Sequence, residues 1–260
     1  RAPCAGSRAS TASSGERGAV SLLATVLLLA VLAQSWRRGP GVAARVAQVI
    51  GRAERSRNLY GWAAGTAVAF ALPAMLALLL MGRFGAVVAM PPELLALAWR
   101  WGMPAATGAD LPWMLASLGL GGVIGIGILA VRRRLGKPPM RAIYRSAAAV
   151  RDRRDLGGAA AIALAAGVGE ELFFRLALPL AAGTLVGSMA AGLGLACVAF
   201  GLAHRHQGWV GVVATAVVGA GLAWVYLWTG ALWVAMVLHV VVDLNALILR
   251  PWLDRLPRVA

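Results

Sequence analysis

Apolar residues in this chain gather into long runs that short polar segments separate. Seven runs approach or reach the ~20 residues that a helix needs to cross the hydrocarbon core of a bilayer. Because backbone amides cannot stay unpaired in hydrocarbon, each run is expected to be helical. The pattern predicts an all-α fold, a polytopic transmembrane helix bundle of about seven spans. The runs cover residues 18–36, 59–82, 113–131, 158–180, 184–204, 209–228 and 231–249.

Two apolar segments need separate interpretation. Residues 84–99 are shorter and broken by Pro91-Pro92, so this stretch is predicted to be an interfacial or re-entrant piece. Run 18–36 follows three arginines, as the apolar region of a signal peptide does. It is about as long as a bilayer-spanning helix and ends in Trp36-Arg37-Arg38 rather than at a small-residue cleavage site. We therefore interpret it as a retained transmembrane helix.

Composition supports a membrane protein and argues against a nucleic-acid-binding one. The chain is 60% hydrophobic and only 13% charged, whereas a soluble domain is about half apolar and about one quarter charged. The net charge is +15, but the basic residues stand in short segments between apolar runs, where the positive-inside rule places them. The expected surroundings are a lipid bilayer, with no nucleic acid partner. Cys4 and Cys197 form no disulfide or metal-binding pattern.

The basic segments also predict an orientation. Residues 37–57 carry six arginines and residues 132–155 carry nine Lys or Arg, whereas the 83–112 connection carries two. Both basic segments and the C-terminus are therefore predicted to be cytoplasmic, with the N-terminus outside. The high Ala, Gly and Arg content is typical of a bacterial protein, so we expect the plasma (inner) membrane. Residues 132–155 are interpreted as a solvated loop; the alternative is an interfacial helix with Tyr144 and Ala148 facing lipid headgroups.

Beyond residue 156 the apolar runs contain ionisable residues, which are costly in a membrane and by default mark a functional site. They are Glu170, Glu171, Arg175, His204, Arg205, His206, His239 and Asp243. At ~1.5 Å per residue, Glu170 lies roughly 18 Å from the cytoplasmic end of its span and His239 roughly 16 Å from the end of its own. The spans can therefore present these groups to one cavity that opens toward the cytoplasm.

Helical spacing assigns roles within this set. Glu171 and Arg175 are four residues apart and share a face, so Glu171 is expected to pair with Arg175. Glu170 points about 100° away, faces the cavity and is the candidate general base. Asp243 follows His239 by four residues, where a carboxylate would fix the imidazole tautomer. Glu170, His204 and His239 could then hold a water, directly or through a metal.

Each of these groups also has a structural alternative. Glu171–Arg175 could be a buried ion pair, His239–Asp243 an interhelical hydrogen bond, and His204 an interfacial side chain. His206 is interpreted as interfacial, because it lies two residues beyond His204 and should face away from it.

Three short motifs on separate spans resemble those of the CPBP family, the CAAX-protease and bacteriocin-processing intramembrane peptidases, also called the Abi family. Its Glu-Glu-x-x-x-Arg motif is matched by residues 170–175. Its Phe-x-x-x-His motif is matched by residues 200–204, and its His-x-x-x-Asn or -Asp motif by residues 239–243. Order and spacing also fit, and the resemblance covers roughly residues 113–249.

The resemblance implies a CAAX prenyl protease-like intramembrane endopeptidase. Its substrate would be a membrane-bound peptide or lipoprotein, cut by a Glu-activated water. Glu170 would be the general base, and His204 and His239 would position water or stabilise the oxyanion. Members are described as metalloproteases and as metal-free glutamic peptidases, so either a divalent metal such as zinc on these three residues or no cofactor is expected. Asp243 stands where the best-studied relatives have Asn, and in this interpretation it orients His239.

The expected organisation follows from these features. Residues 1–112 should hold two transmembrane helices and a polar or interfacial loop, residues 113–249 the peptidase core, and residues 250–260 a cytoplasmic tail. The candidate catalytic residues are Glu170, Glu171, Arg175, His204, His239 and Asp243. The alternative function is a non-catalytic membrane protein, such as a bacteriocin immunity protein, a scaffold or an ion pathway, that uses the same buried charges.

Overall fold

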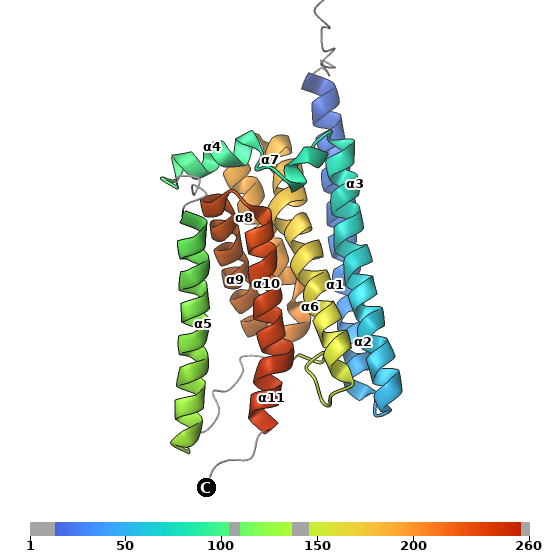
Figure 1. Ribbon diagram of the computed structural model, residues 1–260. Coiled ribbons are helices and arrows are strands. Elements are labelled where there is room, and N and C mark those ends of the chain that lie inside the picture. Colours follow the sequence, from blue (N-terminus) through green and yellow to red (C-terminus); the bar gives the residue numbers. More distant parts are fainter. Residues whose placement is uncertain (1–13, 104–109, 137–145, 256–260) are drawn as a thin grey trace, which may run out of the picture.

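The computed structural model describes residues 14–103, 110–136 and 146–255, and in these ranges every regular element is a helix (Figure 1). The predicted all-α fold is confirmed. The α-helices are α1 (Ser14–Gln48), α2 (Arg52–Thr66), α3 (Leu72–Leu80), α4 (Pro92–Arg100), α5 (Asp110–Arg134), α6 (Asp155–Glu171), α7 (Leu178–Val186), α8 (Met189–Ala203), α9 (Gly208–Thr229), α10 (Leu232–Leu244) and α11 (Arg250–Arg255). The π-helical segments are η1 (Ala67–Ala71), η3 (Leu172–Ala177) and η5 (Asn245–Leu249), and the 3-10 turns are η2 (Phe84–Val87) and η4 (Arg205–Gln207).

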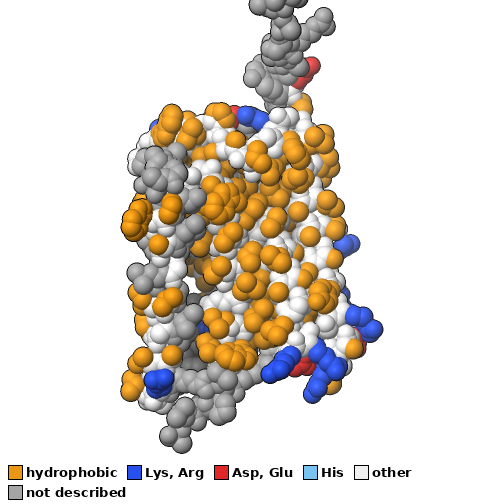
Figure 2. All heavy atoms as spheres, in the orientation of Figure 1, with side chains coloured by type: hydrophobic (Ala, Val, Ile, Leu, Met, Phe, Trp, Pro, Cys, Tyr) orange, Lys and Arg blue, Asp and Glu red, His pale blue; other side chains and the backbone are white. Residues whose placement is uncertain are grey.

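Four helical stretches in the described ranges are long and apolar enough to cross a membrane, and each covers all or nearly all of one predicted run. They are Gly18–Gln48, Arg52–Leu80, Arg205–Thr229 and Leu232–Leu253. The other three predicted runs also lie in helices: 113–131 in α5, 158–180 in the continuous helix Asp155–Val186, and 184–204 mainly in the shorter α8. Apolar side chains cover the visible side of the bundle, and basic side chains gather at its lower end (Figure 2).

The first helix is longer than its apolar run. The run was predicted to end near Trp36, but α1 continues through Pro40 to Gln48, and α2 begins at Arg52. The basic 37–57 segment, which separates two apolar runs in the sequence, is therefore largely helical. A helix of this length extends well beyond a hydrocarbon core of about 30 Å, because it satisfies its own backbone hydrogen bonds in water as well as in lipid.

The segment broken by Pro91-Pro92 forms a short helix at the end of the bundle opposite the basic side chains. Helix α4 begins with Pro92 in its first turn, lies across that end (Figure 1), and is too short to cross a membrane. Arg83 forms an ion pair with Glu93, which ties the start of α4 to the end of α3.

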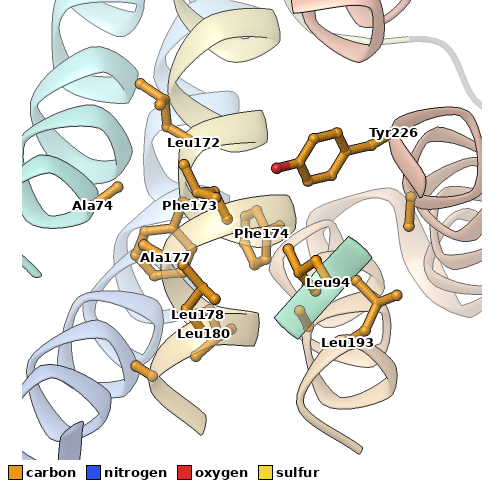
Figure 3. Packing of buried hydrophobic residues seen from close by; sticks show 14 of the residues in the cluster. Ala74, Leu94, Leu172, Phe173, Phe174, Ala177, Leu178, Leu180, Leu193 and Tyr226 are labelled. Atoms are coloured by element: carbon orange, nitrogen blue, oxygen red, sulfur yellow. The ribbon is translucent and has the colours of Figure 1, made fainter. Parts of the chain in front are cut away.

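Buried aromatic and aliphatic side chains fill the centre of the bundle (Figure 3). Phe173 and Phe174 of η3 are at most 1% exposed, and their ring centroids lie 5.3 Å and 5.5 Å from that of Phe70 in η1. Gly167 brings α6 against α10, because a Cβ there would stand 2.4 Å from Val240 Cγ2 and 3.1 Å from the Met236 carbonyl. The core thus fixes the register of the helices that carry the ionisable residues.

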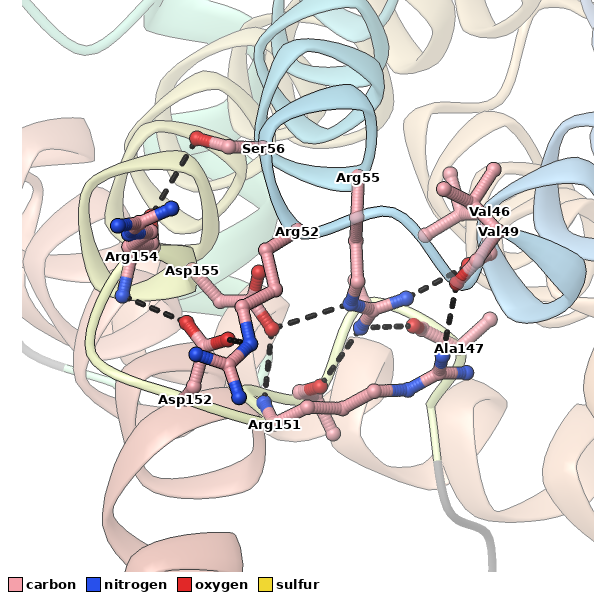
Figure 4. A network of polar contacts seen from close by, with 12 residues as sticks. Val46, Val49, Arg52, Arg55, Ser56, Ala147, Arg151, Asp152, Arg154 and Asp155 are labelled. Atoms are coloured by element: carbon pink, nitrogen blue, oxygen red, sulfur yellow. Dashed lines mark hydrogen bonds and ion pairs between the residues drawn. The ribbon is translucent and has the colours of Figure 1, made fainter.

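At the basic end of the bundle, a network of polar contacts centred on Arg55 connects several helices (Figure 4). Arg55, a residue 3% exposed, donates through its side chain to Asp155 Oδ2 at 3.0 Å, to the Val46 carbonyl at 2.6 Å and to the Ala149 carbonyl at 2.9 Å. Asp155 also accepts from the Arg151 backbone amide at 2.8 Å. One guanidinium therefore links α1, α2, α6 and the segment before α6.

This network corrects one interpretation of the 132–155 segment. Residues 146–154 form turns and bends rather than an interfacial helix. Ala148, expected to face lipid headgroups in that alternative, is 1% exposed. Its neighbours 147 and 149 supply carbonyls to Arg55, which holds the segment against the bundle. Tyr144 lies outside the described residues.

Candidate active site

The two adjacent glutamates end α6 where the helix widens into the π-helical segment η3. Such π-bulges in α-helices are frequent at functional sites. Glu171 is fully buried, and its Oε2 lies 3.1 Å from Nε of Arg175, which is 1% exposed. The spacing of four residues predicted this pair, and the structure places the two side chains in contact.

Arg175 has further partners that fix its planar group. Its Nη2 donates to the Gly219 carbonyl of α9 at 3.2 Å, and its guanidinium carbon stands 4.3 Å from the ring centroid of Phe200 in α8. Gly219 must be small, because a Cβ there would lie 2.7 Å from Phe200 Cδ1. A buried arginine with one carboxylate, one carbonyl and one aromatic face is held in a single orientation.

His239 of α10 is oriented by Glu171. Its Nδ1 lies 2.7 Å from Glu171 Oε1, and its Nε2 lies 3.9 Å from both Glu170 Oε2 and Asp243 Oδ2. Because a carboxylate only accepts, Nδ1 of His239 is the donor in this bond. Asp243 was expected to orient this imidazole from the same helix face, but Glu171 occupies that role from α6. The packing of α6 against α10 makes this possible.

His204 approaches the same carboxylate from α8. Its Nδ1 donates to the Phe200 carbonyl at 2.8 Å, which leaves Nε2 directed at Glu170, with Nε2 4.0 Å from Glu170 Oε2. In the neutral imidazole with a proton on Nδ1, Nε2 is an acceptor. His204 is half-buried and presents this acceptor to the site.

Glu170 stands between the two imidazoles. Its Oε2 makes no hydrogen bond within the described ranges, although the residue is only 7% exposed. Separations near 4 Å exceed a hydrogen bond, but a water about 2.8 Å from two such atoms would bridge them at an angle of about 90°. The three groups can thus share one water molecule.

The spacing is less suited to a metal ion. Donor atoms about 2.0–2.1 Å from a tetrahedral zinc lie about 3.3–3.4 Å from one another. Glu170 Oε2 is 3.9 Å from His239 Nε2 and 4.0 Å from His204 Nε2. Among the residues that the structure describes, no three His, Cys, Asp or Glu side chains gather closely enough to hold a metal. As arranged, these side chains fit a hydrogen-bonded water and do not fit a coordinated ion.

A cavity of about 1100 Å³ gives access to these groups. Glu170, His204, His239 and Asp243 line one part of it. The remaining wall comes largely from α1, α2, η1 and α9, and extends to Arg38 and Arg45 of α1. The site is thus an open compartment and not a set of charges sealed in the core.

His206 differs from its predicted position. It was expected to face away from His204, but the two ring centroids lie 6.0 Å apart and His206 also lines the cavity. The cause is local: α8 ends at Ala203 and residues 205–207 form a 3-10 turn, so α-helical periodicity no longer applies. The ring packs edge-on against Trp62 of α2, with centroids 6.4 Å apart.

Two residues of the site had no role in the sequence-based set. Phe200 supplies its carbonyl to His204 and its ring to Arg175, and Gly219 supplies the carbonyl that Arg175 contacts. Phe200 belongs to the second motif, which was a usable signal. Gly219 is one of three glycines in residues 211–221, and nothing in the sequence of that stretch distinguishes it.

The comparison with protein families finds a match in the C-terminal half of the chain. Residues 153–245 match a family model described as "Type II CAAX prenyl endopeptidase Rce1-like". The matched segment contains all six candidate residues from Glu170 to Asp243, and the predicted resemblance to CAAX proteases is confirmed for it. Neither the comparison with curated proteins nor that with solved structures produced a match.

Proposed function

We propose that this chain, which carries an Rce1-like CAAX endopeptidase segment at residues 153–245, hydrolyses a peptide bond of a membrane-bound, lipid-modified peptide with a water activated by Glu170. The substrate would be CAAX-like and would be cut from the cytoplasmic side of a bacterial inner membrane. The observation that carries the proposal is Glu170 Oε2, which lies within 4.0 Å of both imidazole Nε2 atoms inside the cavity.

The first chemical step is water attack. A water between Glu170 Oε2 and His204 Nε2 donates one hydrogen bond to each, because both atoms are acceptors. Glu170 removes a proton as the water oxygen bonds to the scissile carbonyl carbon. The carbonyl π bond opens, and its electron pair becomes the oxyanion of a tetrahedral intermediate.

His239 is placed to stabilise that oxyanion. Its Nδ1–H is bound to Glu171, so in the imidazolium form Nε2 carries the proton that it donates to the oxyanion. Glu171, paired with Arg175, supplies the compensating charge and fixes the ring. Glu170 then returns the proton to the leaving amine nitrogen, the C–N bond breaks, and a carboxylic acid and an amine are released.

The test is hydrolysis by the full chain in proteoliposomes. The substrate is an internally quenched peptide with an S-prenyl cysteine followed by three apolar residues. Glu170→Gln should lower kcat by at least ~100-fold, because it removes the general base. The matched control is Glu54→Gln, which neutralises an exposed carboxylate on α2 outside the cavity. Full activity in folded Glu170→Gln protein, or no hydrolysis by the wild type, would contradict the proposal and favour a non-catalytic role.

A further inference from the structure

The wall that α1 contributes to the cavity changes character along its length. One face of α1 lines the compartment with apolar side chains, including Leu27 and Val31, then with Gln34 and Ser35, and then with Arg38 and Arg45. These positions follow the three- and four-residue spacing of a single helix face. α1 lies outside the matched segment 153–245, so this wall is a feature of the chain that the family match does not describe.

The contact between α1 and the residue after His204 shows where Arg38 and Arg45 lie, along the axis of α1, relative to the candidate catalytic groups. The guanidinium carbon of Arg205, which follows His204, stands 4.8 Å from the ring centroid of Trp36 in α1. Helix α1 also packs against the turn η4, so Trp36 lies within about one side-chain length of the level of His204. At ~1.5 Å per residue, Arg38 lies about 3 Å farther toward the basic end and Arg45 about 14 Å farther.

The distance along α1 from the level of Trp36 to the two arginines matches the length of a short extended peptide. An extended chain advances at most ~3.3–3.6 Å per residue, so three residues beyond a scissile bond end about 10 Å away. A peptide cut beside Glu170 and His204 would place its terminal carboxylate between the levels of Arg38 and Arg45. The reverse orientation would place that carboxylate about 10 Å toward the other end of the wall, beside apolar side chains such as Leu27 and Val31, where an unpaired charge is costly.

We propose that Arg38 and Arg45 bind the C-terminal carboxylate of the substrate and so make the protein selective for bonds near a free C-terminus. This inference rests on the proposed peptidase function and adds a specificity determinant to it. A guanidinium suits the role, because its planar fork matches the two oxygens of a carboxylate. Both side chains are exposed along the cavity, so the attraction should weaken as salt rises.

The experiment compares two prenylated peptides that differ only at the last group, a free carboxylate in one and a carboxamide in the other. Wild-type protein in proteoliposomes at low salt should cleave the acid about tenfold more efficiently in kcat/KM, the effect of a charge-assisted hydrogen bond. The Arg38→Gln/Arg45→Gln double variant should cleave the acid no faster than the amide. Arg37→Gln, which removes a neighbouring exposed arginine that does not line the cavity, should keep the preference.

The outcomes separate this inference from the function on which it rests. Equal cleavage of acid and amide by the wild type overturns the carboxylate site while leaving the peptidase intact. A preference that survives in the double variant, or an equal loss of both activities in it, also overturns the site. Cleavage of neither peptide by the wild type removes the proposed function, and the inference with it.

Discussion

Glu171 Oε1 lies 2.7 Å from Nδ1 of His239, so the second of the two adjacent glutamates orients an imidazole on another helix. The same carboxylate faces Arg175 with its other oxygen, 3.1 Å from Nε. Glu171 is thereby committed to two partners, and Glu170 alone is directed at the cavity. Glu170 and Glu171 are chemically identical, and their different partners result from the packing of α6 against α10.

Neutralising Glu171 should therefore affect turnover more than substrate binding. In Glu171→Gln the amide oxygen can still accept from Nδ1 of His239, but a charge-assisted bond becomes a neutral one, and kcat should fall about tenfold. KM for the prenylated peptide should change little, because the residue is fully buried and does not line the cavity. A rise in KM at constant kcat would contradict the assignment.

Replacing Arg175 should mainly destabilise the fold. Arg175→Gln leaves the buried Glu171 charge without its cation, a type of change that typically costs ~3–5 kcal/mol. Arg175→Lys keeps the charge but cannot reproduce the planar contacts with the Gly219 carbonyl and the Phe200 ring. Thermal unfolding in detergent should rank wild type above Lys and Lys above Gln. A Gln variant as stable as the wild type would show that the pair is not needed for folding.

The Gly219 position permits a matched test of packing. Gly219→Ala would bring a Cβ to 2.7 Å from Phe200 Cδ1, and Phe200 also holds His204 through its carbonyl. We expect a loss of about 1–3 kcal/mol in stability together with reduced activity. Gly221→Ala is the control, since its Cβ would meet nothing within 4 Å. Similar effects of the two substitutions would refute a specific role for the close approach.

The sequence predicts those contacts of the site that join residues close together in the chain, and not those that join distant segments. The Glu171–Arg175 contact is local to one helix, and its spacing was sufficient to predict it. The Glu171–His239 bond joins residues 68 apart and requires the register between α6 and α10, which no single-sequence periodicity contains. The turn that brings His206 toward His204 depends on where α8 ends. The ends of a helix are predicted from sequence less reliably than its existence.

The same distinction applies to the fold. Long apolar runs predicted the helical bundle, because a span must be helical in lipid. Hydropathy could not give the end of α1 at Gln48, since the basic continuation of a helix resembles a basic loop in composition. Arg55 could not be distinguished from its neighbouring arginines, although it is the one whose side chain is buried against Asp155.

Asp243 offers a further test, because it approaches Nε2 of His239 from the cavity side at 3.9 Å. Asp243→Asn should retain at least wild-type kcat/KM for the prenylated peptide, since an amide can donate to a developing oxyanion without depending on protonation. Asp243→Leu should lose activity, because it offers no polar atom there. An inactive Asn variant that folds normally would mean that the carboxylate itself is required.

Chelation tests the water-based mechanism directly. The separations of Glu170 Oε2 from the two Nε2 atoms exceed the donor spacing around zinc, so activity should survive dialysis against EDTA or 1,10-phenanthroline. Elemental analysis of the purified protein should find substoichiometric metal. Loss of activity that added zinc restores would contradict this expectation.

The Arg55 network has a practical meaning for anyone who wishes to shorten this protein. A fragment that starts at residue 113 would leave the Asp155 carboxylate in an apolar seam without its guanidinium, and would strip Leu59 from the surface of Gly158. Such a fragment would also lack α1, which forms one wall of the cavity. The reactive half and the amino-terminal helices should therefore be expressed, purified and exchanged between homologues as one inseparable body.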